Sequence, residues 1–171
     1  MKESRQKIKV LAPTTQASFG IGSPPNNEPQ NDEERLRFET LITDLSARIC
    51  AVSPDEMDRE IESALHRICE SLGMDLCAVW QWEEGNPAVL VMTHLYRAFE
   101  GPPTPDRMVA SEYFPWSFEQ VLACRTVIMS SAKDMPPEAA RDVEVWGHFG
   151  VKSTLTVPLL VGDEPPFGAI S

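Results

Sequence analysis

The chain has 171 residues, of which 42% are apolar, so it is long enough for one domain with a hydrophobic core and some additional chain. Its formal net charge of −11 argues against binding to nucleic acid or to anionic membranes, because both require a basic face on the protein. No apolar run approaches the roughly 18 residues of a membrane span, and the first apolar segment is too short for a signal peptide. We therefore expect a cytoplasmic protein.

Residues 1–31 are rich in Pro, Gln, Asn, Ser and Gly. This composition buries too little apolar surface to offset the entropy of ordering the chain, so it predicts a flexible leader. The domain itself is predicted to occupy residues 32–171.

Two amphipathic helices are predicted at the start of the domain. The first begins near Asp32, because apolar residues recur at helical spacing from there through Ile49. The second begins at the sequence Ser53–Glu56, where a serine, a proline and a glutamate three residues after the serine form a capping-box pattern. Gly73 supplies the left-handed residue that ends this helix.

Strands and shorter helices are predicted after Gly73. Residues 75–82 alternate in the manner of a strand, and residues 88–96 form its hairpin partner across a turn. The remaining elements are a proline-containing loop over 97–108, a strand over 108–111, a helix capped by Ser117, a strand over 126–130, a helix over 137–149 and a hairpin of 152–161 with 167–170. Antiparallel pairs at both ends, with helices packed on the faces of the sheet, predict an α+β fold.

From about Arg35 to Ser171 the sequence resembles a GAF domain of the kind found in bacterial sensor histidine kinases and related signalling proteins. The resemblance rests on the two leading helices, the strand GMDLCAVWQW, the segment FPWSFEQVL and the stretch PPEAARDVEVWGHFGVKSTLTVPLLVGDEPPFGAIS. It implies a central six-stranded antiparallel sheet with helices on both faces. One face would pack on the terminal helices, and the other, with the loops and short helices between residues 97 and 149, would enclose a small-molecule pocket. It also implies that the last strand is incomplete here and that the family's final helix is absent.

Aromatic residues dominate the candidates for the pocket. Flat rings bury large areas and stack on planar ligands, and four of them fall within six residues beside the long loop, on an element able to move. For any single aromatic residue, ordinary core packing is the alternative interpretation. With the resemblance, the candidate ligand-pocket residues are Trp80, Tyr113, Phe114, Trp116, Phe118, Val127, Met129, Ala139, Asp142, Trp146 and Thr154.

The sequence contains none of the catalytic motifs that we sought, namely GxSxG, HExxH and a phosphate-binding glycine loop. Glu138, Asp142 and Glu144 are expected to form a solvated helix face rather than a pair of catalytic carboxylates. Asp142 is set apart from the other two because the resemblance places this helix at the mouth of the pocket. We therefore expect no enzymatic activity, no metal and no tightly bound cofactor, and an unknown small molecule as ligand.

Several more specific functions have less support in the residues. A bilin would need attachment through Cys124, and haem would need His94 or His148, but no neighbouring Cys–His pair or ligand set is evident. Arg97, Arg107, Arg125 and Lys133 lie in the half of the chain where a cyclic nucleotide would need positive charge, yet they are scattered. A sulfoxide reductase would need a reactive thiol pair, and Cys50, Cys69, Cys77 and Cys124 show none, so buried and unpaired thiols are expected.

Two functional hypotheses remain. In the first, the chain is the sensory input module of a bacterial signalling protein such as a sensor histidine kinase, and forms a homodimer through its terminal helices. In the second, the pocket is filled by the protein's own side chains and the module is only a dimerisation and relay platform. The platform would use Leu41, Leu45, Ile49 and Leu72, each partly facing a partner chain.

Overall fold

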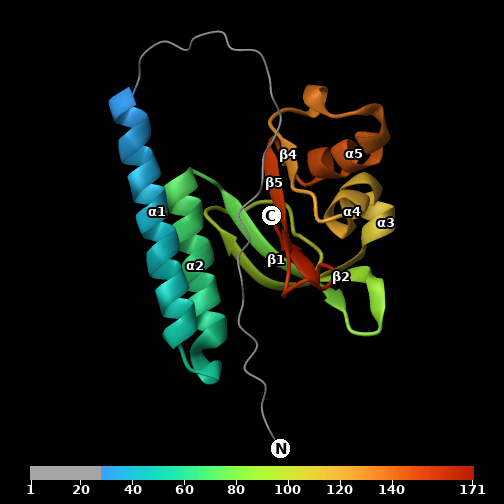
Figure 1. Ribbon diagram of the computed structural model, residues 1–171. Coiled ribbons are helices and arrows are strands. Elements are labelled where there is room, and N and C mark those ends of the chain that lie inside the picture. The colour runs from blue at the N-terminus through green and yellow to red at the C-terminus, as the bar shows by residue number, and fades with distance from the viewer. Residues whose placement is uncertain (1–27) are drawn as a thin grey trace, which may run out of the picture.

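In the computed structural model, which describes residues 28–171, two long helices form a layer on one face of a sheet and three short helices cover the other (Figure 1). The expected leader lies outside the described residues except for positions 28–31. These positions already belong to the first helix, α1 (Glu28–Ala51), so the predicted boundary at residue 31 falls inside that helix.

The sheet has six strands, and every neighbouring pair in it is antiparallel. Its spatial order is β3-β2-β1-β6-β5-β4. The strands are β1 (Leu76–Glu83), β2 (Asn86–Arg97), β3 (Arg107–Val109), β4 (Val127–Met129), β5 (Thr154–Leu159) and β6 (Gly168–Ile170). This confirms the predicted α+β fold with a central six-stranded antiparallel sheet.

The connection between the two long helices differs from the prediction. A single 3₁₀ turn, Pro54–Glu56, precedes the second helix, α2 (Met57–Leu72). Ser53 Oγ donates a hydrogen bond to Glu56 Oε2 at 2.8 Å, so the two capping-box side chains bind each other instead of the backbone. The helix ends at Gly73 as predicted, in the left-handed region with φ of 63°.

The two long helices meet along a narrow apolar contact. Leu41 and Leu45 of α1 are buried against Ala64 of α2, and Ile68 packs on the same cluster. Leu41 and Leu45 were expected to face a partner chain in part, and that prediction is wrong because α2 covers them. The apolar side chains that α1 leaves exposed are others, among them Phe38 and Ile42.

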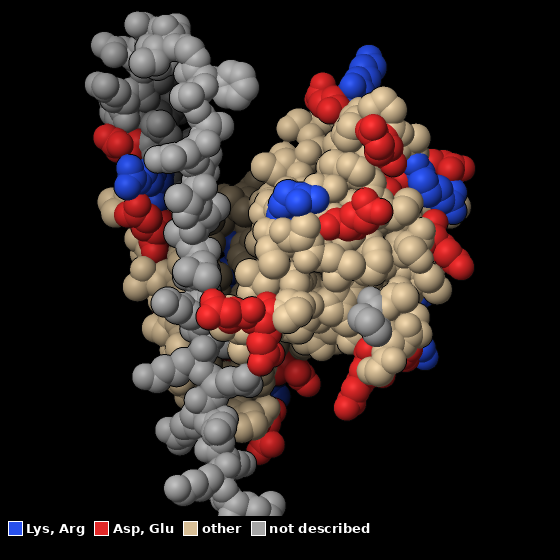
Figure 2. Space-filling view, turned by 45° about the vertical axis from the view of Figure 1, so that its right-hand side comes forward, with Lys and Arg blue, Asp and Glu red and all other residues tan. Residues whose placement is uncertain are grey.

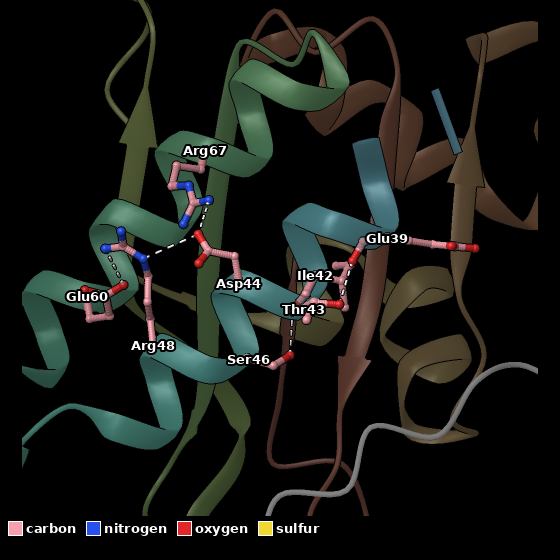
Figure 3. A network of polar contacts seen from close by, with 8 residues as sticks. All are labelled: Glu39, Ile42, Thr43, Asp44, Ser46, Arg48, Glu60 and Arg67. Atoms are coloured by element: carbon pink, nitrogen blue, oxygen red, sulfur yellow. Dashed lines mark hydrogen bonds and ion pairs between the residues drawn. The ribbon is translucent and has the colours of Figure 1, made fainter. Parts of the chain in front are cut away.

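Charged residues border this contact (Figure 3). Asp44 of α1 accepts from Arg67 of α2 at 2.5 Å and lies 3.4 Å from Arg48. Arg48 in turn lies 3.8 Å from Glu60 of α2, which is longer than a hydrogen bond. The helices α1 and α2 are therefore joined to each other by a small apolar cluster and a chain of ion pairs.

The second face of the sheet carries α3 (Ala110–Tyr113), α4 (Pro115–Leu122) and α5 (Ala140–His148). The strand predicted over 108–111 stops at Val109, and the next four residues form α3, which the sequence analysis missed. The helix predicted to start at Ser117 begins two residues earlier, at Pro115. Two 3₁₀ turns, Ala132–Asp134 and Pro137–Ala139, connect β4 to α5.

Strand β6 lies unusually close to β1 at one position. A Cβ atom added to Gly168 would lie 2.1 Å from the carbonyl oxygen of Trp80, and a side chain there would therefore separate the two strands. Glycine at this position keeps the two central strands in contact.

Candidate functional site

The candidate site lies on the face of the sheet opposite α2. Cys77 and Val79 of β1 pack with Leu65 of α2, so the alternating residues Trp80 and Trp82 point to the other face. Successive strand residues alternate in this way, as the sequence predicted for this segment.

Four aromatic side chains, which we call the aromatic seam, come from β1 and α4: Trp80, Trp82, Trp116 and Phe118. All four are half-buried. The ring of Trp82 meets that of Phe118 edge to face, with centroids 5.6 Å apart, and Trp82 Nε1 donates to the carbonyl of Pro166 at 2.6 Å. Trp82 belongs to the aromatic residues that the sequence offered for lining a cavity, but it was left out of the list of candidate pocket residues.

Beside the seam, five of the predicted residues form one apolar cluster. Val127 and Met129 of β4 and Trp146 of α5 are buried together, and Phe114 and Trp116 pack against them. The rings of Phe114 and Trp146 lie 5.8 Å apart. These residues therefore join α4 and α5 to β4, which is the core role weighed as the alternative for each aromatic residue.

Asp142 of α5 joins the short helices by a buried polar contact. It is fully buried, with 0% of its surface exposed, and it accepts hydrogen bonds from the backbone N–H groups of Trp116 (3.1 Å) and Ser117 (2.8 Å). These groups belong to the first turn of α4, where unpaired N–H donors and the helix dipole favour a carboxylate. The predicted cap, Ser117, does not act as one, and its buried Oγ has no hydrogen-bond partner.

The sequence contained a signal for this arrangement. Ala139, Asp142, Val145 and Trp146 recur at helical spacing and are all buried, so the carboxylate of Asp142 stands within the apolar face of the helix. A charge there requires a buried partner. The predicted solvated face is correct for Glu138 and Glu144, which are exposed, and wrong for Asp142, which is buried.

The other predicted residues lie around the cluster and the seam. Thr154 of β5 is paired with Met129 across the β4–β5 ladder and is half-buried on the same face. Ala139 is completely buried in the turn before α5, and Tyr113 is half-buried at the end of α3. Trp80 stands further away, on β1, because β6 and β5 separate it from β4.

The arginines considered for phosphate binding are held by local partners. Arg97 donates to the carbonyl of Pro102 at 2.9 Å, and Arg107 pairs with Glu83. Arg125 bonds a side chain of α4. On the face shown in Figure 2, lysines and arginines are interspersed with acidic residues.

The histidine and cysteine candidates are dispersed. His94 faces α2, where its Nε2 lies 3.4 Å from Asp58, so it is on the far side of the sheet from the aromatic seam. Cys124 is exposed immediately after α4, and His148 is exposed at the end of α5. Within residues 28–171, no three His, Cys, Asp or Glu side chains are grouped so as to hold a metal ion.

The expectation of buried, unpaired thiols is wrong for two of the four cysteines, because they are exposed. Cys50 and Cys124 are exposed, whereas Cys69 and Cys77 are buried together in one apolar cluster. None of the four forms a disulfide. The pair was missed because its members lie on different elements, α2 and β1.

None of the described helices is both long and apolar enough to cross a membrane.

A family model for the GAF domain matches residues 56–171. Solved structures with the same fold include the phycocyanobilin-bound GAF domain from a cyanobacterial phytochrome, with a TM-score of 0.60, 16% identity and 78% of each chain covered. The GAF domain of a phosphoenolpyruvate-protein phosphotransferase from Coxiella burnetii has a TM-score of 0.57 and 13% identity, over 79% of this chain and 76% of that one.

The chromophore-binding domain of Stigmatella aurantiaca bacteriophytochrome has a TM-score of 0.59 and 13% identity. It is matched over 85% of this chain and 53% of its own length. A search of curated proteins finds no match.

Proposed function

The chain belongs to the GAF domain family, and from that premise we propose that it is a non-catalytic sensory module that binds a small molecule at the aromatic seam. The observation that carries the proposal is the edge-to-face contact between Trp82 of β1 and Phe118 of α4. Trp80 on the same face of β1 and Trp116 in the first turn of α4 are half-buried on either side of this contact in the sequence. Ring faces at such a seam offer a large contact area to a flat ligand, and the indole N–H groups add polar contacts.

The surroundings of the seam support this assignment. The cluster of Val127, Met129 and Trp146, on which Trp116 packs, holds α4 and α5 against β4. The two hydrogen bonds that Asp142 accepts, which we call the Asp142 clamp, hold α5 to the start of α4. A ligand contacting Trp80, Trp82 and Phe118 would therefore meet a preformed framework, which lowers the entropic cost of binding. Three of the similar structures bear names that describe bound bilins, and for this chain we propose only a small, largely planar molecule.

Native mass spectrometry of the purified protein, compared with the same sample after denaturation, tests the proposal. A small molecule that is present in the native sample and lost on denaturation supports sensing and gives the ligand's mass. A native mass equal to that of the chain alone, from cells grown under several conditions, would contradict it.

Phe118→Ala tests the location of the site. Because Phe118 contacts Trp82 and lies outside the cluster, we expect the variant to release the copurified molecule while keeping most of its thermal stability. Leu122→Ala is the matched control, since Leu122 is an exposed apolar residue of the same helix. Equal ligand occupancy in the two variants would place the ligand elsewhere.

In the wider protein, we propose that the module is a cytoplasmic input domain of a bacterial signal-transduction protein, with a sensor histidine kinase as the specific candidate. A ligand at the seam changes the output only if it binds one arrangement of the module more tightly than another. The α1–α2 layer is the element we expect to respond, because α2 packs on the opposite face of β1 and β2.

A dimerisation and relay platform is the second candidate, and the exposed apolar residues of the helical layer favour it. Phe38 and Ile42 of α1 are each 44% exposed, and Leu72 of α2 is 45% exposed. A second copy packed on these helices would cover them in a helical bundle.

Sedimentation velocity of the native chain and of Ile42→Glu tests this candidate. A dimer that the charged variant converts to a monomer supports it, whereas a native monomer at high concentration contradicts it. Asn86→Asp, which adds one negative charge at an exposed site at the start of β2, is the control for a change in charge alone.

A further inference from the structure

Two buried thiols meet between the helical layer and the sheet. Cys69 in the last turns of α2 and Cys77 near the start of β1 are 1% and 2% exposed, and they share an apolar cluster with Leu65. Their shared burial in this cluster brings the two thiols together where α2 packs on β1.

The backbone between the two thiols is held tightly. The carbonyl of Cys69 accepts from the N–H of Gly73, the left-handed residue that ends α2, and from the N–H of Met74 at 2.9 Å. Strand β1 begins only two residues later, at Leu76. This short turn fixes the end of α2 beside the start of β1, so the two cysteines approach each other through local geometry.

An aromatic pair borders the thiols. Tyr96 of β2 is the cross-strand partner of Cys77 and packs against the cluster, and the ring of His66 from α2 stacks on Tyr96 with centroids 4.6 Å apart. Only a small, neutral reagent is suited to reach sulfur atoms that are buried in this way.

We propose that Cys69 and Cys77 form an oxidation site, at which hydrogen peroxide converts the two thiols to a disulfide that joins α2 to β1. The site is separate from the aromatic seam, since Cys77 points to the opposite face of β1 from Trp80. It does not depend on the proposed ligand.

The chemistry balances with peroxide as the only co-reactant. One cysteine sulfur attacks a peroxide oxygen, an S–O bond forms, the O–O bond breaks, and the departing oxygen takes up protons to leave as water. The second cysteine sulfur then attacks the sulfenic sulfur, an S–S bond forms, the S–O bond breaks, and a second water leaves with the remaining thiol proton. Two thiols are oxidised and one peroxide is reduced to two waters.

The folded state slows this reaction without preventing it. Burial raises the pKa of both thiols above the ordinary value, that of Cys77 to about 12, so few thiolates form in the closed structure. Oxidation is therefore expected when the last turn of α2 opens, and the resulting bridge then holds that turn to the sheet. Oxidation would in this way fix the helical layer against the face of the sheet that it covers.

The test uses the full chain with Cys50→Ser and Cys124→Gly, which removes the two exposed thiols and leaves the buried pair. The protein is treated with hydrogen peroxide in native buffer, unfolded, alkylated and analysed by peptide mass spectrometry. We expect a chain that has lost two hydrogens, no alkylation of either cysteine and a linked Cys69–Cys77 peptide pair. Because a bridge that closes a short loop restricts the unfolded chain, Tm should rise by roughly 5 °C and return on reduction.

The control is Cys77→Ala in the same background, which cannot form the bridge and should show no reversible rise in Tm. The proposal is overturned if both thiols of the test protein remain fully alkylated at peroxide levels that oxidise Cys124 in the native chain. It is also overturned if the products are only sulfinic and sulfonic acids, or disulfides between separate chains.

Discussion

The two layers that cover the sheet are held together by different forces. The α1–α2 layer combines a small apolar cluster around Leu45 with ion pairs, and two atoms of its charged side chains have no hydrogen-bond partner. Arg67 Nη1 and Glu60 Oε1 are buried without a hydrogen bond. The α3–α5 layer has a buried cluster around Trp146 and a carboxylate whose two oxygens both accept hydrogen bonds.

This difference indicates which layer is able to move. Ion pairs between half-exposed side chains contribute little to stability and re-form easily with new partners (Figure 3). A fully buried and fully paired carboxylate allows no such exchange, because any shift leaves polar groups unpaired in an apolar environment. We therefore expect the α3–α5 layer to be the fixed framework of the site and the α1–α2 layer to be the adjustable one.

Of the substitutions that test this difference between the layers, Asp142→Ala is expected to lower stability most. The change leaves the N–H groups of Trp116 and Ser117 buried and without an acceptor, so the free energy of unfolding should fall by about 3 kcal/mol. Urea denaturation measures the loss, and hydrogen exchange should place it in α3–α5. Glu144→Ala, at an exposed position of the same helix, is the control, and equal losses in the two variants would count against the clamp.

Gly168→Ala should destabilise the sheet that both layers share. The new Cβ would meet the carbonyl oxygen of Trp80 at 2.1 Å, and separating β6 from β1 should cost about 2 kcal/mol. Unlike Asp142→Ala, the variant should raise hydrogen exchange on both layers. Gly147→Ala in α5 has open space around its Cβ and serves as the control. A stable Gly168→Ala protein would show that β6 tolerates displacement.

Cys124→Gly should stabilise the α3–α5 layer slightly. Cys124 has a φ of 57°, a conformation that glycine adopts without steric cost, and it is exposed after the end of α4. The expected gain in the free energy of unfolding is about 0.5 kcal/mol, measured by urea denaturation. Cys50→Ser controls for loss of an exposed thiol, and a destabilised Cys124→Gly protein would contradict the argument from backbone strain.

Asp44→Asn should have the smallest effect on stability. The effect should be confined to the α1–α2 layer. The substitution removes the ion pair with Arg67 but leaves Leu41 and Leu45 buried. We expect a slight drop in Tm that disappears in high salt, because salt already screens this pair in the native protein. A large drop that persists in high salt would mean that the ion pairs fix the helical layer.

The same pair predicts a dependence on acid. The hydrogen bond from Arg67, followed by the charges of Arg67 and Arg48, lowers the pKa of Asp44 below its ordinary 3.8. A carboxyl with a lowered folded-state pKa contributes stability that is fully present above the ordinary value and is lost as pH falls through the folded-state value. The difference in Tm between the native protein and Asp44→Asn should therefore shrink as pH falls below 3.8 and vanish below the lowered folded-state pKa. A difference that grows in acid would contradict the assignment.

Much of this fold was readable from local patterns along the chain. The helical spacing in α2, the left-handed stop at Gly73 and the alternation in β1 each depend on neighbouring residues, so the sequence alone predicted these elements and, with the family resemblance, the six-stranded antiparallel sheet. The resemblance named Val127, Met129 and Trp146 as pocket candidates, and the structure places them together as a buried cluster.

Contacts between distant residues were decided only by the tertiary structure. Ser117 has the local pattern of a helix cap, yet Asp142, 25 residues away, takes that role because burial between α4 and α5 excludes water from the helix terminus. Cys69 and Cys77 show no pairing motif, and they meet because the turn at Gly73 folds β1 back along α2. Side chains that are far apart in the sequence interact only once packing has fixed the helices and strands that carry them. For this reason the Asp142 clamp and the thiol pair were not predicted.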